Sequence, residues 1–182
     1  IPLCEKIRSL GTVKPREIAK IGYRVLKFAG WGELLEYISQ ERPHGAYVKF
    51  VGCRNIEPYL INWDSELRLA GRFFKNSYLI KPSQTDESKW RVLELPKILV
   101  REVGIRLTAA FDQNGKYGNL TGMYALYDLN EKYEPRFLLA LLNSSLLDFY
   151  YKSLYGSTHM AGGYLNFHGS YLENLPIRPS EV

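Results

Sequence analysis

The sequence predicts an α+β domain: a mixed or antiparallel twisted sheet with a long helical segment from the C-terminal half packed on one face. Three observations favour this class. Apolar residues make up 46% of the chain, enough for a hydrophobic core, and charged residues at 24% are close to the globular average. Short β-branched and aromatic segments, separated by turn residues, precede the strongest helical pattern. The length of 182 residues suits one domain, or one domain with a small appendage.

The first forty residues carry little regular pattern. Between Ile1 and Lys27 basic and apolar residues mix without a sustained period, which predicts irregular chain with a short strand at Tyr23 to Phe28. Trp31 to Gln40 has apolar residues at helical spacing and predicts a short amphipathic helix. We therefore expect residues 1–40 to form a lead-in segment with a short helix, and residues 41–182 to form the main domain.

Two short strands are predicted before the middle of the chain. They lie at Ala46 to Val51 and at Tyr59 to Trp63, and Pro58 between them indicates an edge or a bend. The stretch from Lys81 to Arg91 is polar and contains Pro, Ser and Asp, which is typical of a surface loop. This loop divides the two halves of the predicted domain.

Three further strands follow. Lys97 to Val103 is short and β-branched, as in a buried strand, and Arg106 to Asp112 alternates between the two faces. The Asn114-Gly115 pair adopts positive φ readily and predicts a turn, after which Gly122 to Leu129 resumes as strand. This order predicts a hairpin whose tip carries residues 116–117.

Pro135 to Tyr155 is the strongest helical signal, because apolar residues recur there every three or four positions. Asn143-Ser144-Ser145 interrupts the apolar stripe. These polar residues fit either the polar face of one long helix or an N-cap that starts a second helix. From Gly156 the tail is rich in Gly, Ser, His and Tyr, and the Gly162-Gly163 pair requires a flexible or tightly turned backbone.

Several kinds of catalytic site lack their motifs. The chain has neither the Gly-rich loop nor the Asn/Asp-Pro-Pro-aromatic loop of an adenine methyltransferase domain that binds S-adenosylmethionine. It also has no phosphate-binding P-loop, no H-E-x-x-H helix and no G-x-S-x-G elbow. His44, His159, His168 and the two cysteines do not have metal-ligand spacing. We therefore predict no catalytic residue, cofactor or metal site within this chain.

Charge and cysteine usage indicate the setting. Residues 1–91 contain 16 Lys and Arg against 10 Asp and Glu, whereas residues 92–182 contain 8 against 9. This excess favours an anionic partner for the N-terminal half. Two cysteines are too few for a disulfide framework, which predicts a reducing, cytoplasmic location. No run of 18 apolar residues occurs, so no membrane partner is expected. The chain begins at Ile1, and we expect it to be a piece of a longer polypeptide.

Some side chains are suited to reading a nucleic acid. Duplex recognition needs cations for phosphates, and planar or amide side chains for base edges, on loops held by a rigid scaffold. The cationic candidates are Arg54, Arg101, Arg106, Lys116 and Lys152, all except Arg101 being assigned to phosphates. The planar and polar candidates are Tyr117, Ser157, His159, Tyr164, Asn166 and His168, and the five in the tail are assigned to base edges. The alternatives are an ion pair of Arg101 with Glu102, and a tail whose tyrosines pack on the domain.

A set of short motifs, in a fixed order, resembles a known family. The motifs are Arg54 to Tyr59, Pro96 to Arg101, Met123 to Leu126, Leu138 to Ser144, Phe149 to Tyr151, Gly162-Gly163 and Tyr171 to Ile177. Together they resemble the C-terminal specificity domain of TaqI-like adenine-N6 DNA methyltransferases and the related single-chain type IIG restriction-modification enzymes. Cys53 departs from the pattern, since a glycine is usual there.

The resemblance implies a target recognition domain over residues 41–182. Such a domain reads a short site in double-stranded DNA and positions one adenine for a separate methyltransferase domain, here expected upstream in the same polypeptide. That catalytic domain would hold S-adenosylmethionine, and this chain would not be catalytic by itself.

Three alternatives remain at this point. The first is one recognition half of a separate type I specificity subunit. The second is a small metal-dependent nuclease that uses Asp64, Glu87 and Lys89, although the polar surroundings of Glu87 favour a solvated loop. The third is a protein-interaction module with no role in nucleic-acid binding.

Overall fold

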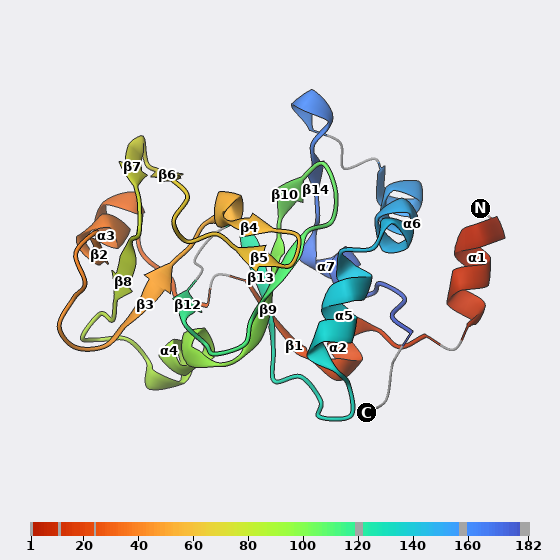
Figure 1. The fold of residues 1–182 in the computed structure, drawn as a ribbon, viewed down its shortest axis with the longest axis horizontal. Coiled ribbons are helices and arrows are strands. Elements are labelled where there is room, and N and C mark those ends of the chain that lie inside the picture. The colour runs from red at the N-terminus through yellow and green to blue at the C-terminus, as the bar shows by residue number, and fades with distance from the viewer. Residues whose placement is uncertain (1, 11, 24, 119–121, 157–159, 179–182) are drawn as a thin grey trace.

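The structure, a computed structural model, describes residues 2–10, 12–23, 25–118, 122–156 and 160–178. One sheet has four antiparallel strands in the order β1 (Lys20–Tyr23), β13 (Met123–Tyr127), β9 (Lys97–Arg101) and β11 (Ala109–Asp112). Helices from the C-terminal half lie beside this sheet (Figure 1). The α+β class is confirmed.

The central strands β9 and β13 are covered on both faces. Their sequences, KILVR and MYALY, consist mainly of β-branched, aromatic and other apolar residues, which suit a buried strand. Alternate side chains enter different cores: Ile98 and Val100 join the cluster under the helices, whereas Leu99 joins a smaller cluster with Val51 and Ile56. The sheet therefore separates the helical layer from the rest of the domain.

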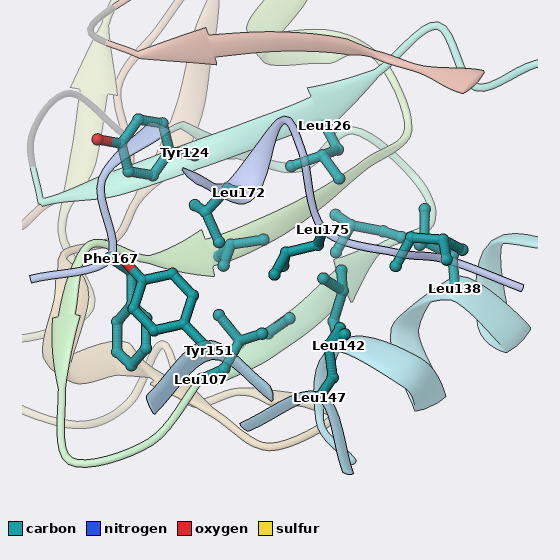
Figure 2. Packing of buried hydrophobic residues seen from close by; sticks show 14 of the residues in the cluster. Leu107, Tyr124, Leu126, Leu138, Leu142, Leu147, Tyr151, Phe167, Leu172 and Leu175 are labelled. Carbon is teal, nitrogen blue, oxygen red and sulfur yellow. The ribbon is translucent and has the colours of Figure 1, made fainter. Parts of the chain in front are cut away.

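The helical segment consists of two helices, α5 (Pro135–Leu142) and α6 (Ser145–Tyr155). The hydroxyl of Ser144 accepts a hydrogen bond from the Leu147 N–H at 3.1 Å and caps α6, so the second of the two sequence-based alternatives is correct. Figure 2 shows leucines of both helices packed with Leu107 and with residues of the C-terminal tail. The tail continues through α7 (Gly169–Leu172).

The prediction of irregular chain over the first 27 residues is wrong. This segment forms α1 (Pro2–Ser9), α2 (Pro15–Ile18) and β1. Strand β1 ends at Tyr23, the residue at which the predicted strand Tyr23 to Phe28 was expected to begin. Cys4, Ile7 and Ile18 belong to the same buried cluster as the apolar face of α5 and α6. The elements are only four to eight residues long, too short to show a period in the sequence.

A second sheet is mixed. Its order is β12 (Tyr117–Gly118), β3 (Tyr47–Phe50), β8 (Tyr78–Ile80) and β2 (Ile38–Ser39), and only the β12–β3 pair is parallel. One face packs on α3 (Trp31–Glu36) and α4 (Glu87–Glu94) through a cluster that includes Val48, Leu79 and Trp90.

Helix α4 corrects the predicted surface loop at Lys81 to Arg91. Asp86 caps the helix, since its Oδ1 accepts a hydrogen bond from the Ser88 N–H at 2.9 Å. Trp90 and Leu93 are buried on its inner face. Five of its eight residues, Glu87 to Arg91, lie within the polar stretch. Only one of the two buried apolar residues, Trp90, is among them, so the stretch shows no helical period.

The predicted hairpin between residues 106–112 and 122–129 does not form. Strand β9 lies between β11 and β13, and the chain leaving β11 crosses to the second sheet as β12. Residues 116–117 therefore join the two sheets instead of forming a hairpin tip. The order of strands in a sheet depends on contacts between distant segments, which a local turn signal does not contain.

Three two-stranded ribbons complete the domain. They are β4 (Ile56–Glu57) with β5 (Leu60–Ile61), β6 (Leu67–Leu69) with β7 (Arg72–Phe74), and β10 (Val103–Gly104) with β14 (Leu165–Asn166). Two short 3-10 turns, η1 (Cys53–Asn55) and η3 (Ala161–Gly163), adjoin them. The β6–β7 and β10–β14 ribbons rise on the same side of the molecule, at the top of Figure 1. Among the helices of the described residues, none has the length and apolar character needed to cross a membrane.

Candidate nucleic-acid interface

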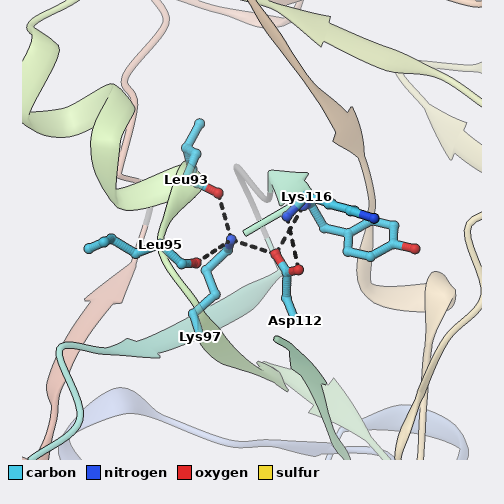
Figure 3. Close-up of polar contacts among 6 residues, drawn as sticks. Leu93, Leu95, Lys97, Asp112 and Lys116 are labelled. Carbon is cyan, nitrogen blue, oxygen red and sulfur yellow. Dashed lines mark hydrogen bonds and ion pairs between the residues drawn. The ribbon is translucent and has the colours of Figure 1, made fainter. Parts of the chain in front are cut away.

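A buried ion pair anchors the segment between the two sheets. Lys97 Nζ lies 2.7 Å from Asp112 Oδ2, and the side chains are 0% and 2% exposed. The same ammonium donates hydrogen bonds to the carbonyl oxygens of Leu93 and Leu95 at 2.6 and 3.2 Å (Figure 3). Burial lowers the pKa of Lys97, and the charge of Asp112 opposes that shift. Each donor direction of the ammonium is thus occupied.

Asp112 also orders the turn that follows it. Its Oδ1 and Oδ2 accept hydrogen bonds from the backbone N–H groups of Lys116 and Tyr117, each at 2.9 Å (Figure 3). Gly115 in this turn has a φ of +60°, and a Cβ there would collide with the carbonyl oxygen of Glu94. The hydrogen bonds to Asp112 and the close approach of the Glu94 backbone to Gly115 therefore fix the turn, and the Lys116 side chain on it is exposed.

Beside this turn lies a pocket of about 570 Å³ on the outward face of the second sheet. In β3, Val48 and Phe50 point into the core, so Tyr47 and Lys49 point outward into the pocket. Its lining consists of Arg42, Tyr47, Val48, Lys49, Trp63, Tyr78, Glu94, Gly115 and Lys116. We call it the basic-aromatic pocket.

Arg54 lies at a second, smaller pocket of about 320 Å³. Arg68 and Trp31 line the same pocket, together with the turn between β6 and β7 and with Gly122. The buried amide of Asn55 fixes the turn that carries Arg54: its Oδ1 accepts from the Gly52 N–H at 2.8 Å, and its Nδ2 donates to carbonyl oxygens of the following loop. This arrangement leaves the Arg54 side chain exposed.

Unlike Arg54 and Lys116, the remaining predicted cations have side chains that are hydrogen-bonded, ion-paired or partly buried. Arg106 donates from Nη2 to the carbonyl oxygen of Asn143 at 2.6 Å, beyond the end of α5. Lys152 pairs with Asp148 at 2.7 Å on α6. Arg101 forms no ion pair with Glu102 or another described residue, and its Nε is buried without a hydrogen-bond partner among them.

The tail combines packing with exposure. Leu165 and Phe167 are buried, whereas Tyr164 is 48% exposed and His168 is exposed as well. Asn166 has a buried Oδ1 that no described residue contacts by a hydrogen bond. Tyr171 in α7 stacks on Tyr155, the last residue of α6, with 4.1 Å between the ring centres. The predicted Ser157 and His159 lie outside the described residues.

The residues of the nuclease alternative do not form a metal site. Glu87 is the first residue of α4, and its carboxylate pairs with Lys81 at 2.5 Å. Within the described part of the chain, no group of three or more His, Cys, Asp or Glu side chains is placed to hold a metal ion. The geometry gives this alternative no support.

Apart from Arg101, Arg106 and Lys152, the predicted residues that the structure describes form three groups. Lys116 and Tyr117 adjoin the basic-aromatic pocket, Arg54 lies at the smaller pocket, and the tail residues 164–168 include β14 and the residues on either side of it. Sequence reasoning missed Arg42, Lys49, Trp63 and Arg68. The only sequence signal for Lys49 was its position between two buried strand residues, which predicts an outward side chain but no partner.

Comparison with known families decides the classification. The model of the family described as the TaqI-like C-terminal specificity domain matches residues 48–177. The chain belongs to this family. No curated protein matches the chain.

The TaqI-like match begins within β3 and ends at Ile177, so it includes α5, α6 and every strand of the two four-stranded sheets except β1 and β2. The motifs that carried the resemblance form the centre of the fold: Pro96 to Arg101 contains β9, Met123 to Leu126 lies in β13, and Leu138 to Ser144 spans most of α5 and the α6 cap. These three motifs are mainly scaffold. The exposed Lys116 lies between two of them, and the exposed Arg54 begins a separate motif, Arg54 to Tyr59.

Proposed function

We propose that this chain recognises a short sequence in double-stranded DNA for a restriction-modification adenine methyltransferase. In this proposal a catalytic domain upstream in the same polypeptide binds S-adenosylmethionine and transfers the methyl group. The chain grips the duplex and positions the target adenine, which must leave the base stack before a methyltransferase can reach it. The family match over residues 48–177 is the observation that carries the proposal.

The distribution of side chains supports a division of labour. Phosphate contacts set register and orientation, and contacts to base edges carry sequence information. Arg54 and Lys116 are exposed cations on ordered turns, so we assign them to phosphates. Tyr164, Asn166 and His168 lie together on the β14 segment, at the side of the molecule where two ribbons project, and we assign them to base edges.

The proposal is tested by mapping methylated adenines in the source cells with and without the gene that encodes this chain. We expect one short sequence motif to lose its adenine methylation when the gene is deleted. An unchanged methylation pattern would contradict the proposal. An Asn-Pro-Pro-aromatic loop upstream in the same reading frame would distinguish the fused arrangement from a separate type I specificity subunit.

A further inference from the structure

The basic-aromatic pocket gathers three cations from separate parts of the chain. Lys49 comes from β3, Lys116 from the turn before β12, and Arg42 from the segment before β3. The Lys49 N–H donates to the Lys116 carbonyl oxygen at 2.8 Å, so the backbones of these two residues are direct neighbours. The pairing of the backbones therefore brings the side chains of Lys49 and Lys116 together at the pocket.

These cations keep their charge available. In the described part of the chain, four other lysines form ion pairs: Lys20, Lys81, Lys97 and Lys152. Arg42, Lys49 and Lys116 pair with no carboxylate of the described residues. The one acidic residue that lines the pocket, Glu94, accepts a hydrogen bond from Trp90 Nε1 at 2.6 Å.

Aromatic rings hold the cations in place. Lys49 Nζ lies 4.0 Å from the centre of the Trp63 ring and 5.8 Å from that of Tyr117. Arg42 donates from Nε to the Tyr47 hydroxyl at 2.6 Å. A cation–π contact orients an ammonium group without neutralising it. These contacts orient Lys49 and Arg42 from within the protein itself.

We propose that the basic-aromatic pocket binds a backbone phosphate of the DNA duplex. Three cations without ion-pair partners outnumber the single carboxylate of Glu94 in this concave site, and such an excess of positive charge favours an anion. A stacked base is disfavoured as occupant, because Lys49 already covers the face of Trp63. The proposal rests on the proposed function, and it adds Arg42 and Lys49 to the residues that contact DNA.

The buried pair of Lys97 and Asp112 positions this site. Asp112 receives the N–H of Lys116, and Lys97 ties Asp112 to the end of α4, which also supplies Glu94 to the pocket wall. The pair itself is buried and cannot touch DNA. Its role here is to fix the backbone of Lys116, from which the side chain extends.

The test compares the salt dependence of duplex binding for single variants of the 182-residue chain. Lys49→Gln and Lys116→Gln each remove one charge at nearly constant length. Each lost phosphate contact reduces the slope of log affinity against log salt by about 0.9. Between 50 and 200 mM salt, the affinity of each variant is therefore expected to fall about 3.5-fold less than that of the unmodified chain.

Two controls accompany the measurement. Lys132→Gln removes an exposed charge in the segment between β13 and α5, away from the pocket lining, and should leave the slope unchanged. Glu94→Gln removes the negative charge from the pocket wall and should raise the affinity. If the unmodified chain binds DNA but Lys49→Gln and Lys116→Gln behave like Lys132→Gln, the pocket is not a phosphate site and the proposed function stands. If the unmodified chain does not bind DNA, both fail.

Discussion

At the scale of single residues, the pair of Lys97 and Asp112 is the most constrained polar feature. Both charges are buried. They are stabilised by each other, by two carbonyl oxygens that accept from Lys97 and by two backbone N–H groups that donate to Asp112. Removing one partner of such a pair leaves an uncompensated buried charge, which is far more costly than never burying the pair. The sequence offered no sign of it, because the partners are 15 positions apart and each resembles an ordinary strand residue.

Asp112→Asn tests this constraint. The substitution keeps shape and an acceptor but leaves the Lys97 ammonium without its carboxylate. We expect the free energy of unfolding to drop by about 3–5 kcal/mol, measured by urea titration. Lys116→Ala, which alters the adjacent exposed side chain, should change it by less than about 0.5 kcal/mol. Equal effects of the two variants would show that the pair is not the anchor.

The lowered pKa of Lys97 predicts a pH dependence. In the unfolded chain this lysine holds its proton up to its ordinary pKa of 10.5, whereas the folded state releases it earlier. The unfolded state thus binds more protons in the window below 10.5, and stability from this group rises with pH there. We expect the difference in free energy of unfolding between the unmodified chain and Lys97→Met to increase from neutral pH toward 10.5. A decrease would mean that the folded environment favours the charged form.

At the scale of elements, the junction between α5 and α6 shows what the sequence could and could not predict. The Asn143-Ser144-Ser145 stretch indicated a possible break, because a serine at an N-cap is a local signal, but it fitted one long helix as well. The role of Asn143 was out of reach: its side chain bonds the N–H and the carbonyl oxygen of Ala109, 34 positions away. Local chemistry therefore pointed to the position of the break without deciding that it occurs, and long-range contacts determine how the helix is attached.

Ser144→Ala measures the cap. Loss of the hydrogen bond to the Leu147 N–H should lower the free energy of unfolding by about 1 kcal/mol. Ser145→Ala is the matched control, since Ser145 is exposed in the first turn of α6 and does not cap it. A single continuous helix would instead make both substitutions neutral or stabilising, because alanine is the better helix former.

The turn at Gly115 permits a second test at this scale. Gly115→Ala places a methyl group at positive φ and against the Glu94 carbonyl, whereas Gly45→Ala meets a similar φ with open space around it. Backbone strain should lower the free energy of unfolding of both variants by about 1 kcal/mol. The clash with Glu94 should destabilise Gly115→Ala further, so this variant should have the lower melting temperature. It should also weaken DNA binding, because the turn carries Lys116. Equal melting temperatures for the two variants would show that the turn adjusts freely.

At the scale of the whole molecule, a buried scaffold carries separate groups of exposed polar side chains. The family motifs were found from the sequence because β9, β13 and α5 are continuous in the chain. The basic-aromatic pocket was not, because its residues come from five separate stretches of the chain, which the fold brings together beside the second sheet. The predicted hairpin failed for the same reason: only the tertiary fold decides that β9 lies between β11 and β13.

Base and phosphate contacts should differ in their effects on sequence preference. Asn166→Ala and His168→Ala are expected to relax discrimination at individual base pairs, by about 1–3 kcal/mol where a bidentate contact is lost. Arg54→Ala should weaken binding to all duplexes alike and reduce the salt slope by about 1. Affinity measured across a library of duplexes distinguishes the two outcomes. Identical profiles for the three variants would contradict the assigned roles.

The most direct test of the account is the affinity of the 182-residue chain for duplex DNA, measured by fluorescence anisotropy at salt concentrations between 50 and 200 mM. A DNA-recognition domain releases counterions on binding, so its affinity must fall steeply and linearly on a log–log scale as salt increases. Absence of binding, or binding that salt does not weaken, would contradict the account and favour a protein-interaction module.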